Sequence, residues 1–95
     1  MTTAVNPANP TDANAHADAV VTLRGQIDAL DAAIVSLVAE RARLSQRIQT
    51  TRMNAGGTRV ELSRERVIMA TYRDALGNNG PALADAVLQV CRGQR

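Results

Sequence analysis

Several charged side chains in this sequence stand where a helix needs apolar ones. Arg41 interrupts a series of aliphatic residues whose spacing alternates between four and three: Leu23, Ile27, Leu30, Ile34 and Leu37 before it, and Leu44 and Ile48 after it. A buried charge costs several kcal/mol unless it is paired and hydrogen-bonded. Arg41 is therefore a member of a structural salt bridge, a residue that sets coiled-coil register, or one side of an anion-binding site.

A second arginine and a further group of charges favour the anion-binding site. Arg52 follows Arg41 by 11 residues, which returns it to within about 20° of the same helix face. Further charges lie at the start of the next predicted helix, on the face formed by Glu61, Arg64, Glu65, Ile68 and Tyr72. Arginine is suited to bidentate binding of carboxylates. The pattern indicates a pocket for a ligand with two carboxylates and a hydroxyl.

Apolar periodicity predicts three helices to position these charges, one long and two shorter. The first covers about residues 20–54 and ends at the Gly56-Gly57 pair. The second covers 61–76 and the third 81–92, with a proline at its first position. Alanine and leucine are abundant and strand-forming residues sparse, so the fold class is all-α.

The first 18 residues differ in composition from the rest. Two prolines, three asparagines and a single large aliphatic residue, Val5, cannot bury enough apolar surface to offset the entropy of ordering. We expect a disordered tail over 1–18 and one helical domain over 19–95. The start resembles no secretory signal and no apolar run is long enough for a membrane span, so we expect a cytoplasmic protein.

Charge and cysteine content exclude other classes. A net charge of +2, with arginines balanced by acids, argues against nucleic-acid binding. The single cysteine, Cys91, cannot form an internal disulfide and is most simply a small buried hydrophobe. No cluster of cysteine and histidine offers a metal site.

The helix lengths predict a homodimer. A compact fold of about 76 residues has a diameter of roughly 30 Å, whereas the first helix would be roughly 52 Å long. The other two helices, roughly 24 and 18 Å long, cannot cover its apolar seam. An intertwined pair of chains with their long helices together would bury the seam.

With these features, the sequence resembles the all-helical chorismate mutases of the shikimate pathway over about residues 22–92. Their first-helix signature is similar to the segment LRGQIDALDAAIVSLVAER, which ends at Arg41. Arg52 stands where the family usually has Lys or Arg, and Glu61-x-x-Arg64-Glu65 resembles its second-helix motif. The loop GGTR and the terminal CRG most resemble small bacterial members that work with a separate partner.

The resemblance implies an enzyme that converts chorismate to prephenate by a unimolecular [3,3] rearrangement without metal or cofactor. It implies that Arg24 from the opposite subunit and Arg41 clamp the two carboxylates, while Arg52 donates to the ether oxygen and to a carboxylate. Arg24 and Arg41 are 17 residues apart, about 25 Å along a helix. Both can therefore hold one ligand only if Arg24 comes from the partner subunit.

The other implied site residues belong to the second and third helices. By resemblance, Glu61 and Glu65 accept a hydrogen bond from the ring hydroxyl and Arg64 lines the pocket. Leu88 and Arg92 stand where many relatives have a polar residue and a glutamine, so Arg92 would be a second cation near the ether oxygen. The resemblance also implies an activating partner, 3-deoxyheptulosonate-7-phosphate synthase.

Three alternatives remain at this stage. An isochorismate-pyruvate lyase or an aminodeoxychorismate mutase would use the same fold and the same carboxylate-binding arginines. The glutamates beside the ring substituent favour a hydroxyl group there, and hence chorismate. A non-enzymatic dimeric helical adaptor would need Arg41 only for register and leaves Arg52, Glu61 and Glu65 unexplained.

Overall fold

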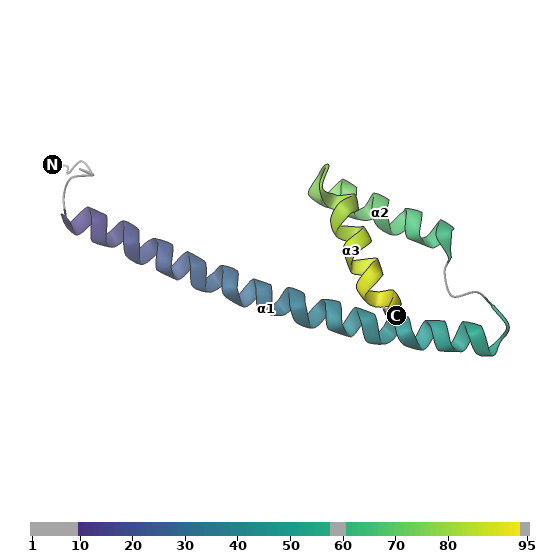
Figure 1. The fold of residues 1–95 in the computed structure, drawn as a ribbon. Coiled ribbons are helices and arrows are strands. Elements are labelled where there is room, and N and C mark those ends of the chain that lie inside the picture. Colours follow the sequence, from purple (N-terminus) through teal and green to yellow (C-terminus); the bar gives the residue numbers. More distant parts are fainter. Residues whose placement is uncertain (1–9, 58–60, 94–95) are drawn as a thin grey trace. The chain divides into compact units, whose positions relative to one another are not determined.

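The computed structural model describes residues 10–57 and 61–93, and these form three helices (Figure 1). They are α1 (Pro10–Asn54), α2 (Leu62–Leu76) and α3 (Gly80–Arg92). No strand occurs within these residues. The all-α prediction and the bounds of the second and third helices are confirmed to within one residue.

The predicted end of the first helix is confirmed. After Asn54, Gly56 has a φ of 85°, a left-handed conformation that glycine adopts without the steric cost of a Cβ atom. Its N–H donates to the carbonyl of Met53 at 3.0 Å, and the N–H of Gly57 donates to the carbonyl of Arg52 at 2.7 Å. These bonds satisfy carbonyls that the end of the helix would leave without partners.

The predicted start of the first helix, near residue 20, is wrong, because α1 begins at Pro10. Proline lacks an N–H that the first helical turn could not use, and Asp12 in that turn complements the helix dipole. Alternate alanines then continue the helix at little entropic cost. Residues 10–18 are therefore helical rather than part of the expected tail. Residues 1–9 lie outside the described residues, and the domain boundary at 18/19 stays a prediction.

Two compact units divide the chain inside α1, between Ile34 and Val35. In the first unit, the aliphatic side chains of the seam are exposed, and Leu30 is 62% accessible. A single helix offers these side chains nothing to pack against. The seam predicted from the sequence is thus present but uncovered within this unit.

The second unit contains the rest of α1 together with α2 and α3, which pack against each other (Figure 1). Among its described residues, the buried apolar ones lie on α3 and are Ala84, Val87, Leu88 and Cys91. This periodicity places one face of α3 at the centre of the unit. None of the helices in the described part of the chain is long and apolar enough to cross a membrane.

We predict that Gly80→Ala destabilises the protein by about 1–3 kcal/mol. A Cβ atom at residue 80 would lie 2.3 Å from the carbonyl oxygen of Tyr72, so the backbone at the corner between α2 and α3 would have to move. The free energy of unfolding, measured in urea at fixed protein concentration, gives the effect.

The matched control is Gly25→Ala, because nothing lies within 4 Å of a Cβ atom there. Gly25 is inside α1, so alanine should stabilise the helix by about 0.5–1 kcal/mol. Equal changes in the free energy of unfolding for Gly80→Ala and Gly25→Ala would contradict close packing between Gly80 and the end of α2.

Candidate active site

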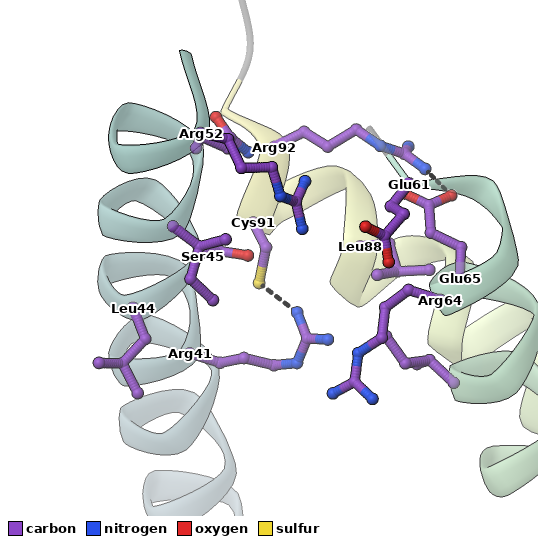
Figure 2. A pocket seen from close by; sticks show the side chains of 13 residues that line it. Arg41, Leu44, Ser45, Arg52, Glu61, Arg64, Glu65, Leu88, Cys91 and Arg92 are labelled. Carbon is purple, nitrogen blue, oxygen red and sulfur yellow. Dashed lines mark hydrogen bonds and ion pairs between the residues drawn. The ribbon is translucent and has the colours of Figure 1, made fainter. Parts of the chain in front are cut away.

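A cavity of about 230 Å³ lies within the second unit (Figure 2). All three helices contribute to its wall, together with Glu61 just before α2. Six of the thirteen lining residues are charged, and the lining consists of Arg41, Leu44, Ser45, Ile48, Gln49, Arg52, Glu61, Arg64, Glu65, Ile68, Leu88, Cys91 and Arg92. Four arginines against two glutamates give the cavity an excess of positive charge, as an anion-binding site requires.

The α1 side of the cavity follows from helical spacing. Arg41, Ser45, Gln49 and Arg52 recur at intervals of three and four residues and all line the cavity. The prediction that Arg41 and Arg52 share one face is therefore confirmed. Both guanidinium groups extend from α1 toward the opposite wall (Figure 2).

Arg41 is anchored on α3. Its Nη1 donates a hydrogen bond to Sγ of Cys91 at 3.0 Å (Figure 2). Cys91 is only 2% accessible, so the prediction of a buried cysteine is confirmed. A second property of Cys91 was not predicted from the sequence: its thiol accepts a hydrogen bond from a charged residue in the cavity.

Arg92 is anchored on α2. Its Nη2 donates to Oε1 of Glu65 at 2.5 Å, and the two side chains are 33% and 18% accessible (Figure 2). This hydrogen bond raises the pKa of Arg92 above its ordinary value, although desolvation by burial opposes the shift. Arginine is already protonated at working pH, so this pair holds a permanent cation in the cavity wall. The stability that this shift contributes is fully present below the ordinary pKa of arginine and is lost as the pH rises through the raised pKa of Arg92.

The remaining residues predicted for α2 and α3 also line the cavity. Glu61 caps α2 with an extended backbone, and Arg64 lies in the first turn of the helix. Leu88 is buried and presents an apolar side chain to the cavity. Seven of the eight predicted site residues thus come together around one cavity.

Arg24 is the exception. It lies in the first unit, is exposed, and does not belong to the cavity lining. The role predicted for Arg24 is in the site of a second subunit, which a single chain does not test. That role stays a prediction.

Two polar residues in the lining were not predicted from the sequence. Ser45 and Gln49 lie four and eight residues after Arg41, and this spacing alone could have found them. Gln49 is the more informative, because it is only 9% accessible. Buried amides generally make hydrogen bonds, so a ligand in the cavity has this group within the wall to interact with.

In the described part of the chain, no three His, Cys, Asp or Glu side chains gather closely enough to hold a metal ion. The three helices and the excess of arginine in the lining describe an all-helical protein with a cavity whose charge suits a small polyanion.

Comparison with known proteins identifies the family. The model of the family described as chorismate mutase type II matches residues 23–93. The chain belongs to this family.

Two curated relatives carry the name intracellular chorismate mutase. The protein from Mycolicibacterium smegmatis is 43% identical over 72 residues, which are 76% of this chain and 69% of the relative. The protein from Mycobacterium tuberculosis strain H37Rv is 45% identical over 73 residues, which are 77% of this chain and 69% of the relative.

A solved structure has the same fold. It is a chain from the non-covalent complex of DAHP synthase and chorismate mutase of Corynebacterium glutamicum with a bound transition state analog. The TM-score is 0.77 at 40% identity, and the match covers 83% of this chain and 96% of that chain.

We predict a measurable energetic coupling between Glu65 and Arg92. A double-mutant cycle with Glu65→Gln and Arg92→Gln should give about 1 kcal/mol in the free energy of unfolding, because both side chains are partly screened by solvent. The exposed pair Glu40–Arg43 on α1 is the matched control, and there we expect only a few tenths of a kcal/mol. Coupling no larger than in the control would show that the pair does not hold α3 to α2.

Proposed function

We propose that the cavity binds chorismate and that the protein converts it to prephenate. Chorismate mutase, an isomerase, is the function of the family to which the chain belongs. The observation that carries the proposal is the lining of four arginines and two glutamates in a chain of that family. Chorismate has two carboxylates, an ether oxygen and a ring hydroxyl, which this set of donors and acceptors matches.

The reaction needs no proton transfer and no nucleophile. The ether C–O bond breaks while a C–C bond forms within the same molecule, and negative charge develops on the ether oxygen. Catalysis then comes from holding the flexible enolpyruvyl arm in a chair-like conformation and from donors aimed at that oxygen.

We assign the roles of the lining residues by resemblance to the family. Arg41 binds one substrate carboxylate, and Arg52 donates to the ether oxygen and to a carboxylate. The two glutamates, Glu61 and Glu65, accept from the ring hydroxyl. Arg64 lines the pocket and Leu88 supplies apolar contact without a hydrogen bond.

Arg92 acts as a second cation near the ether oxygen. In the free protein its guanidinium is hydrogen-bonded to Glu65, so a substrate hydroxyl has to share Glu65 with Arg92. Sharing is feasible because a carboxylate offers about four lone-pair sites. The pair thereby links the hydroxyl end of the substrate to the ether end.

A homodimer completes the proposed site. The exposed seam of the first unit, from Leu23 to Ile34, is the apolar surface that a second copy would cover. Arg24 lies next to this seam and would enter the site of the partner subunit.

We also propose DAHP synthase as an activating partner, and the cytoplasm as the location. The support for the partner is the solved complex of DAHP synthase with chorismate mutase from Corynebacterium glutamicum. The support for the location is that the mycobacterial relatives are named intracellular.

Family membership does not favour the alternatives. Neither a lyase of isochorismate, a mutase of aminodeoxychorismate nor a helical adaptor is named among these relatives. The adaptor also leaves the shared cavity of Arg41, Arg52 and the glutamates without a purpose.

We expect the purified protein to consume chorismate and form prephenate, with Arg52→Ala lowering kcat far more than it raises KM. A donor to a developing oxyanion contributes about 3–4 kcal/mol, or roughly a hundredfold to a thousandfold in kcat. Loss of chorismate absorbance gives the rate, and product identification separates prephenate from other products.

Arg52→Lys serves as the matched control and should keep partial activity, since charge matters more than fork geometry at this position. Wild-type kcat in Arg52→Ala would make Arg52 a structural residue. Absence of prephenate with wild-type protein, also in the presence of DAHP synthase, would refute the proposed function.

The shared site predicts complementation between two inactive variants, Arg24→Ala and Arg41→Ala. After subunit exchange, each mixed dimer has one site with both arginines and one site with neither. Random pairing makes half of the dimers mixed, so roughly a quarter of wild-type activity should return. Mass spectrometry verifies the exchange, and a mixture that then stays inactive would exclude a site built from two subunits.

A further inference from the structure

Two arginines of the cavity, Arg41 and Arg92, are anchored by different kinds of partner. Cys91 accepts a hydrogen bond from Arg41, and Arg92 donates one to Glu65 (Figure 2). The first contact joins a cation to a neutral group, whereas the second joins a cation to an anion. The two arginines are thus both anchored, but only the charge of Arg92 is offset by its anchor.

We propose that Cys91 is a positioning residue, whose thiol orients the Arg41 guanidinium toward a substrate carboxylate without cancelling its charge. The inference rests on the proposed function, because it concerns the arginine that binds chorismate there. Cys91 acts through Arg41 and makes no bond to the reacting atoms.

The geometry carries this role. Among the described residues, Cys91 supplies the acceptor that the structure gives to the Arg41 guanidinium, at 3.0 Å and 50 residues away in sequence. Because Cys91 is 2% accessible, its sulfur is fixed by the packing of α3. A guanidinium has five N–H donors, so one bond to sulfur leaves four for the ligand.

An anchor is useful because arginine is long and flexible. An unanchored Arg41 would lose more rotamer freedom when the substrate binds, and this loss would weaken binding. With the side chain oriented in the free protein, less of that entropy is lost on binding.

A thiol is suited to this task because it is a weak, neutral acceptor. A carboxylate at the same position would bind the guanidinium strongly and compete with the substrate carboxylate. The same cavity contains one such arginine–carboxylate contact, between Arg92 and Glu65.

Three variants of Cys91 test the proposal by steady-state kinetics with chorismate. Cys91→Ser keeps an acceptor and should stay within about twofold of the wild-type kcat/KM. Cys91→Ala loses the acceptor and should raise KM about 3- to 10-fold, as expected for the loss of one weak hydrogen bond, with kcat nearly unchanged. Cys91→Asp should raise KM further, because its carboxylate competes for Arg41.

Val87→Ala is the matched control for loss of packing. Val87 is buried on the same helix and lies outside the cavity lining. This substitution should lower thermal stability at least as much as Cys91→Ala and leave KM unchanged. If Val87→Ala raises KM to the same extent, the effect of Cys91 is general destabilisation and the proposal fails.

A cycle with Arg41→Ala tests whether Cys91 acts through Arg41. Because Arg41→Ala is expected to be inactive, the affinity for the product prephenate, measured by calorimetry, replaces KM in this cycle. In that background, Cys91→Ala should weaken prephenate binding no further, because there is no guanidinium left to orient. An undiminished effect would mean that Cys91 acts independently of Arg41.

A measurement on the free protein separates this proposal from the proposed function. The ¹⁵N relaxation of Arg41 Nε should indicate an ordered side chain in the wild type and in Cys91→Ser, and a mobile one in Cys91→Ala. An Arg41 equally ordered in all three, in an active wild-type enzyme, overturns the positioning role alone. A wild-type protein without chorismate turnover overturns the substrate role of both residues, whatever the relaxation data.

Discussion

Two adjacent side chains in the last turn of α3 connect the three helices of the cavity. Cys91 accepts from Arg41 of α1, and Arg92 pairs with Glu65 of α2. Residues adjacent on a helix point about 100° apart, so the last turn of α3 directs one side chain toward Arg41 of α1 and the other toward Glu65 of α2. The position of α3 therefore determines where the charges of the other two helices meet.

The small core explains why polar contacts carry so much of this arrangement. The buried apolar residues of the second unit lie on α3, and α2 has none among them. Large aliphatic side chains on α1 and α2 are instead exposed, Leu37 and Leu62 among them. A chain with so little apolar burial is short of stabilising free energy by itself. Covering the exposed apolar faces, as in the proposed homodimer, would supply the missing burial.

Local features of the site could be predicted from the sequence, and contacts between helices could not. The spacing from Arg41 to Arg52 is a property of one helix, and the glycine at residue 56 ends that helix by backbone geometry. The bond from Arg41 to Cys91 spans 50 residues and that from Arg92 to Glu65 spans 27. Such contacts depend on how helices pack, which periodicity does not specify. The start of α1 was missed for another reason, since exposed alanines favour helix without any burial.

The excess of positive charge in the cavity suits a substrate that carries two negative charges. Four arginines and two glutamates leave two positive charges in the cavity of one chain, and the proposed Arg24 of a second copy would add a third, opposite the two carboxylates of chorismate. The glutamates also determine where the positive charge acts. Glu65 offsets Arg92, whereas the neutral Cys91 leaves the charge of Arg41 available to a ligand. For a rearrangement without proton transfer, catalysis depends on how fixed charges are placed around the substrate, and this cavity places them through contacts between its own side chains.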